Sequence, residues 1–350
     1  MTKTHFGVLL APYSAEMHVG ELPNVAPDQL LLKMEMCNIC TEDYQRWLGL
    51  REFNKPMADG HEYTGIIIEK GRNVSDIYQI GDRVGRLNDH CGVCEDCRRG
   101  LSSDCQNTGP KMGIGLEDYY GQKAFADYKI IPQRLAVRIS NEIPAPQAAF
   151  LEPLATVIAG IKRLHIKPLE TVVVIGAGPM GLLNAQVAKI YGANVIITEL
   201  VPKKILRGKS LGIGEVVDSS RFEPEKEVLR LTKGVGADAI IFAVGNSIAY
   251  QQGYKMLKKL RGRMLFFAAN YPKPELDCDP NDIHYRKMEL IGTYNADNAD
   301  FFDAANMLSN GIIDVSTSLE GQVFPLREYA KAMETASMAD YRISVDCQGT

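Results

Sequence analysis

The sequence predicts a two-domain α/β protein in which an irregular β domain precedes a doubly wound parallel sheet. Three observations predict this fold class. The length of 350 residues suits about two domains. Short strand-like runs interrupted by Gly and Pro fill the stretch before Gln147, and regular strand–helix repeats begin at Thr171.

Composition narrows the possible functions. Hydrophobic residues make up 45% of the chain and charged residues 23%, as in an ordinary globular protein with enough apolar material for a core. The net charge of −4 argues against a surface for nucleic acid or an anionic membrane. No apolar run reaches the roughly 18 residues that span a bilayer. The N-terminus lacks a signal-peptide cleavage pattern, so we expect a cytoplasmic protein without nucleic-acid or membrane partners.

The first part of the chain contains isolated strand-like segments and two short polar motifs. The segments are Val8–Leu10, Leu30–Met34, Tyr63–Glu69, Arg83–Leu87 and Ala124–Ile131. Cys37 and Cys40 have the C-x-x-C spacing of a redox pair or half a zinc site, but no thioredoxin-like βαβ pattern surrounds them. His61 and Glu62 follow Gly60 at a strand entrance, where such a pair is by itself typical of an ordinary surface.

Four cysteines give the strongest local signal. Cys91, Cys94, Cys97 and Cys105 have C-x2-C-x2-C-x7-C spacing, which lets four thiolates meet at one tetrahedral point. Such a site has no open coordination position, so the spacing predicts a structural zinc. An iron–sulfur cluster and four unrelated buried thiols are the alternatives.

Residues 147–164 predict a mostly apolar helix that carries the chain from the first domain into the second. Glu152 lies inside this run, directly before Pro153. A carboxylate there is costly to bury unless it is paired or bound to a metal.

A Gly-rich turn follows the strand-like run Thr171–Ile175 and predicts a dinucleotide site. Its glycines have G-x-G-x-x-G spacing, a helix follows, and the acid Glu199 ends the next apolar run. The predicted cofactor-binding residues are Gly176, Gly178, Pro179, Met180, Gly181 and Glu199. The acid favours NAD because a carboxylate repels a 2′-phosphate, whereas Lys203, Lys204 and Arg207 keep NADP open as a minority option.

Further strand–helix repeats extend the sheet. Strands are predicted at 171–175, 194–198, 215–217, 238–243, 263–267 and 288–292, with helices at about 180–191, 202–211, 223–232 and 248–260. Beyond about 295 we predict a helix at 300–309 and strands at 323–325 and 342–346, and expect this tail to return to the first domain.

Together these motifs resemble the zinc-dependent medium-chain dehydrogenase/reductase family. The motifs are Cys40 within CNIC-T-E-D, Gly60-His61-Glu62, the four-cysteine lobe, Leu151-Glu152-Pro153-Leu154 and GAGPMG at 176–181. Within the family, the sequence is most similar to the sorbitol, galactitol-phosphate and threonine dehydrogenase group, which also has Glu directly after the ligand His, here Glu62, and Glu before Pro-Leu, here Glu152. The resemblance implies a GroES-like domain at 1–154, completed by about 295–350, a Rossmann domain at 155–294, and an active-site cleft between them.

The resemblance also implies a catalytic zinc. Its ligands would be Cys40 and His61, with Glu62 and Glu152 as ligands or neighbouring carboxylates, and the choice between these two acids stays open. One thiolate, one imidazole and one carboxylate leave a coordination position for an alcohol oxygen. Cys37 is expected to be a buried strand thiol.

One position departs from the family pattern. The family usually has Ser or Thr two places after the ligand Cys, where the hydroxyl relays the substrate proton, and here that place is Glu42. Asp43 matches the pattern. Glu42, Thr41 or a zinc-bound water is therefore our hypothesis for the proton carrier, and the alternative is that Glu42 points away while Thr41 takes the role.

Substrate-contacting residues are less defined. Arg46, Trp47 and Arg51 lie in a region that lines the substrate cleft in relatives, and Tyr294 and Asn295 are further candidates. Either arginine can bind a carboxylate or phosphate, or both can be solvated. Trp47 can form an apolar wall, stack on a sugar ring or serve in the core.

The leading prediction is an enzyme that oxidises a secondary alcohol of a polyol, sugar or hydroxylated amino acid to a ketone, reversibly, with zinc and NAD. The alternatives are a dehydrogenase of phosphorylated or acidic substrates, a lyase or isomerase with transient oxidation by bound NAD, and a non-catalytic NAD-binding protein. A zinc site with an open coordination position would have no purpose in a non-catalytic protein, which disfavours this last alternative. The resemblance implies a homodimer or homotetramer.

Overall fold

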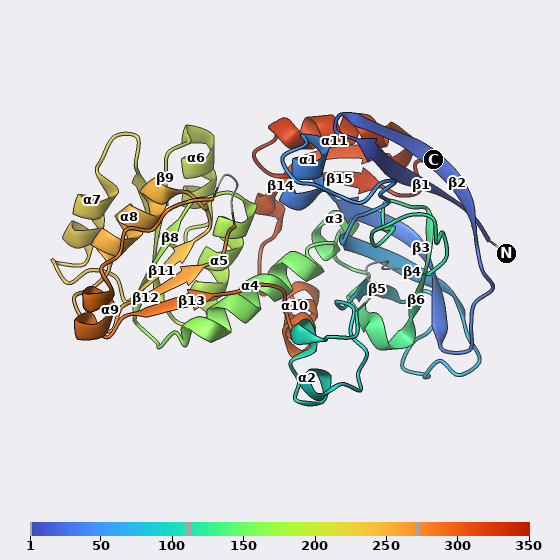
Figure 1. Cartoon of the computed structure of the whole chain (residues 1–350), viewed down its shortest axis with the longest axis horizontal. Coiled ribbons are helices and arrows are strands. Elements are labelled where there is room, and N and C mark those ends of the chain that lie inside the picture. Colours follow the sequence, from blue (N-terminus) through green and yellow to red (C-terminus); the bar gives the residue numbers. More distant parts are fainter. Residues whose placement is uncertain (1, 109–113, 270–272) are drawn as a thin grey trace. The chain divides into compact units, whose positions relative to one another are not determined.

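The computed structural model describes residues 2–108, 114–269 and 273–350 (Figure 1). The chain divides into two compact units. The first contains the residues up to Ala155 together with Ala296–Thr350, and the second contains Thr156–Asn295. Among the described residues, no helix is both long enough and apolar enough to cross a membrane.

The first unit is built on a largely antiparallel sheet with the order β14-β15-β3-β4-β5-β7, with β6 also paired to β3 and a separate β1-β2 hairpin. Its strands are β1 (Thr2–Ala11), β2 (Ser14–Leu22), β3 (Gln29–Asn38), β4 (Glu62–Lys70), β5 (Arg83–Arg86), β6 (Tyr128–Pro132), β7 (Ala136–Arg138), β14 (Leu319–Pro325) and β15 (Arg342–Asp346). Its helices are α1 (Thr41–Trp47), α2 (Glu95–Arg98), α3 (Ala145–Ala148), α10 (Asn298–Ser309) and α11 (Tyr329–Met338).

Both ends of the chain contribute to this unit, and in Figure 1 the red β15 and α11 belong to the same unit as the blue β3 and α1. β15 pairs antiparallel with β3 over Ser344–Asp346. The core beneath contains Leu30, Leu32, Met34, Tyr63, Ile67, Phe125, Tyr329, Ile343 and Val345. The predicted return of the tail therefore brings Arg342 to the strand that leads into Cys40.

Several predicted elements have different bounds, and two of these differences have a clear local reason. The strand predicted at 124–131 begins only at Tyr128, because Ala124 donates its backbone N–H to Asp59 instead of to a strand neighbour. The helix predicted over 147–164 is split into α3 and α4 (Leu151–Leu164). Pro153 lacks an N–H and therefore fits only in the first turn of a helix, so a new helix begins at Leu151.

The second unit confirms the doubly wound parallel sheet. Its strands have the order β10-β9-β8-β11-β12-β13 and every pair is parallel. They are β8 (Thr171–Ile175), β9 (Asn194–Glu199), β10 (Gly214–Asp218), β11 (Ala239–Phe242), β12 (Arg263–Phe266) and β13 (Glu289–Gly292). The intervening helices are α5 (Pro179–Ile190), α6 (Pro202–Ser210), α7 (Pro224–Leu231), α8 (Ser247–Met256) and α9 (Pro280–Arg286), the last of which the sequence analysis did not anticipate.

The strand order reverses at β8, so the Gly-rich turn after β8 lies at the switch point of the sheet. In open α/β sheets this is where ligands bind. The order thus puts the predicted dinucleotide site at the carboxyl end of the central strands.

Candidate functional site

Cys40 occupies the N-cap of α1. Its backbone is extended, and its N–H donates to Asp43 Oδ2 at 2.8 Å, as in a capping box. Glu42 and Asp43 place negative charge in the first turn, which the helix dipole favours. The local sequence therefore fixes both the start of α1 and the position of the Cys40 thiol.

His61 and Glu62 lie where β4 begins. Gly60, just before them, has φ +98°, and a Cβ there would lie 2.9 Å from the Phe125 ring and 3.0 Å from Cys37 Sγ. Only Gly fits this close turn. The fold brings one ligand atom each of Cys40, His61 and Glu62 within 4.8 Å of one another, which suits a single metal ion.

Arg342 is the site residue that the sequence analysis missed. Its Nε and Nη2 donate to the two oxygens of Glu62 at 3.0 and 2.8 Å. Nη1 also lies 3.3 Å from Thr41 Oγ1, and Nη2 lies 3.6 Å from Cys40 Sγ. Burial would lower the pKa of Arg342, but the charges of Glu62 and Cys40 and the hydrogen bonds to Glu62 together outweigh it and raise that pKa. The only sequence signal was a lone charge at the start of an apolar strand.

Glu152 comes from the first turn of α4 and is partly buried. Burial, opposed by the charge of His61 and assisted by that of Glu62, raises its pKa to about 7. Among the described residues no group donates a hydrogen bond to its carboxylate. Glu152 does not belong to the close group of Cys40, His61 and Glu62.

The carboxylate of Glu42 is held by two guanidinium groups. Arg46, one helical turn further on, binds its Oε1, and Arg51 Nη1 lies 3.2 Å from the same oxygen. Arg46 also donates from Nη1 to Asp59 Oδ2 at 2.7 Å. Trp47 is 6% exposed, lies in the core and meets Tyr13 edge to face.

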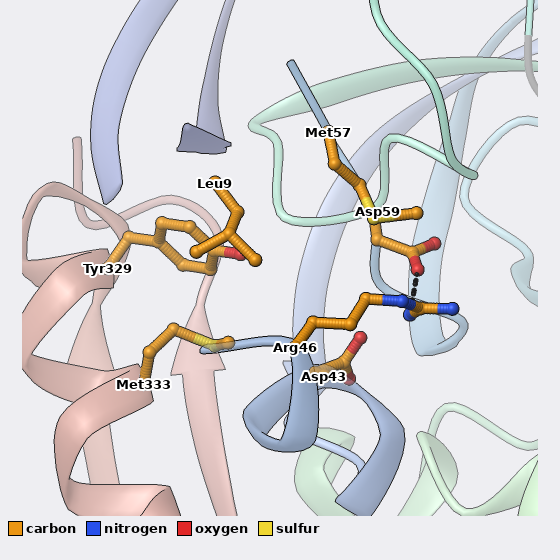
Figure 2. Close-up of a pocket in the computed structure, with 7 residues that line it drawn as sticks. All are labelled: Leu9, Asp43, Arg46, Met57, Asp59, Tyr329 and Met333. Atoms are coloured by element: carbon orange, nitrogen blue, oxygen red, sulfur yellow. Dashed lines mark hydrogen bonds and ion pairs between the residues drawn. The ribbon is translucent and has the colours of Figure 1, made fainter. Parts of the chain in front are cut away.

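Behind this network is a small cavity, whose lining Figure 2 shows. It is lined by Leu9, Asp43, Arg46, Met57, Asp59, Tyr329 and Met333. Asp43 Oδ1 and Arg46 Nε are buried there without a hydrogen-bond partner among the described residues. The space open to the centre of a water molecule is about 10 Å³, which is about enough for one ordered water in the cavity.

The four-cysteine lobe forms a closed thiol cluster. Cys91 and Cys97 have their sulfur atoms 3.9 Å apart, as do Cys94 and Cys105. The edge of a tetrahedron of thiolates around zinc is about 3.8 Å for a bond of about 2.3 Å, so the donor set fits zinc. Backbone N–H groups of Val93 and Cys94 lower the pKa of Cys91 to about 5, which favours the thiolate.

In the second unit the Gly-rich turn is shaped for a phosphate. Gly176 has φ +102°, and a Cβ on Gly181 would lie 2.0 Å from Gly176 O, so both must be Gly. A Cβ on Gly178 would meet nothing within 4 Å, which leaves its backbone open to a ligand. Pro179 and Met180 begin α5, whose N-terminus faces the turn.

Glu199 ends β9 next to this turn. Its carboxylate accepts hydrogen bonds from the backbone N–H of Ala177 at 2.7 Å, Leu200 at 2.7 Å and Val201 at 2.9 Å. It is therefore fixed beside the first turn glycine. Tyr294 and Asn295 follow β13 in this unit, and the Tyr294 side chain is exposed.

Family models match both parts of the chain. The alcohol dehydrogenase GroES-like domain matches residues 26–141, and the zinc-binding dehydrogenase domain matches residues 179–310. Sorbitol dehydrogenase of Halalkalibacterium halodurans is 29% identical, with 90% of each chain covered. D-arabitol-phosphate dehydrogenase of Enterococcus avium is 27% identical, with 95% of each covered, and L-threonine 3-dehydrogenase of Chelativorans sp. is 29% identical, with 84% of each covered.

Solved structures share the whole fold. A Sinorhizobium meliloti protein described as a zinc-binding dehydrogenase and bound to NADP superimposes with TM-score 0.85 and 24% identity, covering 99% of this chain and 100% of that one. The 2R,3R-butanediol dehydrogenase of Bacillus subtilis superimposes with TM-score 0.82 and 20% identity, covering 98% and 99%.

Proposed function

Because the chain belongs to the zinc-dependent medium-chain dehydrogenase/reductase family, we propose that it oxidises a secondary hydroxyl of a polyol, sugar or related hydroxylated compound to a ketone, reversibly and with NAD. The observation that carries the proposal is the close group of Cys40, His61 and Glu62, with a further acid, Glu152, in the same unit. When bound, zinc supplies Lewis-acid stabilisation of the alcohol oxygen and NAD supplies the hydride acceptor.

We assign the direct carboxylate ligand to Glu152, although Glu62, and not Glu152, has an oxygen within 4.8 Å of the ligand atoms of both Cys40 and His61. Both oxygens of Glu62 already bind Arg342, whereas the Glu152 carboxylate has no hydrogen-bond donor among the described residues. In this assignment Arg342 holds Glu62 beside the metal. The Glu152→Gln protein should then lose zinc from the Cys40 site. The Glu62→Gln protein should keep this zinc and have mainly a lower free energy of unfolding. Zinc content after gel filtration separates the two.

The released proton needs a relay, and we assign that role to Thr41, with Glu42 as the alternative. Tyr44 donates its hydroxyl to Thr41 Oγ1 at 3.4 Å, so Thr41 can take up the substrate proton while it gives its own to Tyr44, and the partly exposed Tyr44 can release a proton to water. Thr41→Val should lower kcat and change the pH dependence of kcat for every alcohol. An unchanged profile would exclude Thr41.

We propose NAD over NADP on the strength of Glu199. Its carboxylate is fixed beside the glycine turn, where it suits a ribose diol and repels a 2′-phosphate.

We further propose that the protein is cytoplasmic and forms a homodimer or homotetramer. Light scattering during gel filtration gives the oligomer size.

NADH formation by zinc-loaded protein tests the function directly. NAD and NADP are compared across polyols, sugar phosphates, sugars and hydroxy amino acids. Reduction of NAD by a neutral polyol supports the proposal, and reduction only by phosphorylated substrates overturns its substrate class. Tightly bound NAD without net reduction by any compound would instead favour a lyase or isomerase with transient oxidation.

A further inference from the structure

We propose that Glu42 is a specificity-determining residue whose Oε2 accepts a hydrogen bond from a second hydroxyl of a neutral polyol substrate. This inference rests on the proposed function. It assigns Glu42 to recognition of the substrate and not to transfer of its proton.

The position of Glu42 brings it near the proposed metal ligands. It lies two residues after Cys40, in the first turn of α1, and its side chain is 33% exposed.

Both arginines contact the same carboxylate oxygen of Glu42. Arg46 and Arg51 both contact Oε1, whereas Oε2 accepts no hydrogen bond among the described residues. An ionised oxygen accepts hydrogen bonds more strongly than a neutral one. Because the two arginines already hold the side chain, little entropy is lost when a substrate hydroxyl binds.

The same contacts disfavour an anionic substrate. Arg46 lies between Glu42 and Asp59 and is 11% exposed, so its guanidinium is committed to two carboxylates of the protein. Arg51 is more exposed, at 38%, but also contacts Glu42. A phosphate or carboxylate approaching Oε2 would meet a like charge. We therefore assign the two arginines to positioning Glu42 and not to binding a substrate anion.

The test compares two alcohols of the same carbon length, a vicinal diol and a monohydric secondary alcohol, with zinc-loaded enzyme and NAD. In Glu42→Gln we expect kcat/KM for the diol to fall about tenfold to a hundredfold, because a charged hydrogen bond is lost. The loss should appear mainly in KM, since the bond forms with bound substrate. The value for the monohydric alcohol should change less than about threefold.

Glu328→Gln is the matched control, because Glu328 forms an exposed ion pair with Lys331 in the same unit. This variant should have the wild-type kcat/KM for both alcohols. Calorimetry of the diol binding to the zinc-loaded complex with NADH gives a readout that does not depend on turnover. Diol affinity should fall in Glu42→Gln and stay the same in the control.

Equal losses for both alcohols in Glu42→Gln would overturn the proposal, because Glu42 would then act on the chemical step. No change for either alcohol, or an unchanged diol affinity, would also overturn it. If the wild-type protein oxidises neither these alcohols nor any compound of the wider panel, the proposed function fails, and the calorimetric comparison still decides the role of Glu42.

Discussion

At the scale of single residues, Arg342 and Glu62 form a buried ion pair beside the proposed metal ligands Cys40 and His61. The two side chains are 5% and 1% exposed and meet through two hydrogen bonds. Removing one member of such a buried pair leaves an uncompensated charge, which is far more costly than losing an exposed pair.

Arg342→Met should therefore lower the free energy of unfolding by about 3–5 kcal/mol. Urea unfolding followed by fluorescence measures it, since Trp47, the only tryptophan, lies in the core of the same unit. Lys331→Met is the control, because its exposed pair with Glu328 lies in the same unit and contributes about 0–1 kcal/mol. Equal effects of the two changes would contradict the prediction.

Lys129 is a second buried charge, 3% exposed, and it donates to Gln122 O. Burial, with the nearby charges of Arg86 and Lys123, lowers its pKa well below the ordinary range. Between this lowered pKa and about pH 10.4, the unfolded chain binds a proton that the folded chain does not. This difference destabilises the fold more as the pH decreases from that value.

Lys129→Met should remove the free-energy cost of burying this amine and raise the free energy of unfolding by about 1–4 kcal/mol at neutral pH. The gain should shrink as the pH approaches 10.4 or so. Urea unfolding at several pH values measures it, with Lys3→Met as an exposed control. A gain that is constant with pH would show that Lys129 is charged in the folded protein.

At the scale of elements, two glycines of the Gly-rich turn have different roles: Gly181 is needed for stability and Gly178 for cofactor binding. Gly181→Ala should destabilise the second unit by at least about 1–3 kcal/mol, because the new methyl would clash with Gly176 O. Gly178→Ala meets no protein atom and should leave stability nearly unchanged, yet its methyl occupies the approach of a pyrophosphate. Thermal unfolding and NADH fluorescence titration compare the two. Undiminished NADH affinity in Gly178→Ala would exclude this turn as the cofactor site.

The four-cysteine lobe also secures the segment by which the chain returns to the first unit. Ser103 N donates to Asp297 Oδ1 at 2.8 Å, and Asn298 N donates to Ser102 Oγ at 2.9 Å. These bonds join the lobe to the N-terminal end of α10. Order in the lobe should therefore maintain order at the start of this helix.

Cys97→Ser should weaken metal binding and increase hydrogen exchange in the lobe and in residues 297–301. Exchange in β8 and β11 should stay slow, because both strands lie in the sheet of the second unit. Exchange measured by mass spectrometry tests this. Unaltered protection at the start of α10 would show that the helix does not depend on the lobe.

At the scale of the whole molecule, the two proposed metal centres differ in how firmly they would hold zinc. Four thiolates form a closed site, whereas Cys40, His61 and one carboxylate leave a position open. Mild chelation should remove one zinc per chain and abolish oxidation while the circular dichroism spectrum is retained. Stronger chelation should remove the second zinc and lower the melting temperature. Loss of both ions together would contradict this order.

Much of the fold followed from local signals in the sequence. The strand 171–175 was predicted with its observed bounds, because an apolar β-branched run ending at a glycine turn has few other structures. Cysteine spacing predicted the thiol cluster for a similar reason, since four ligands within one short loop hardly depend on the rest of the fold. α9 was missed because its short polar stretch has no clear apolar period.

The sequence by itself determined the two kinds of domain, the glycine turn with Glu199, and the residue types that suit zinc. Only the tertiary structure decided which side chains meet: Arg342 with Glu62, and Arg46 with both Glu42 and Asp59. Contacts within one turn or one loop are encoded by spacing. A pair such as Arg342 and Glu62, 280 positions apart, forms only because β15 and β4 both pair with β3, and no local pattern records that arrangement.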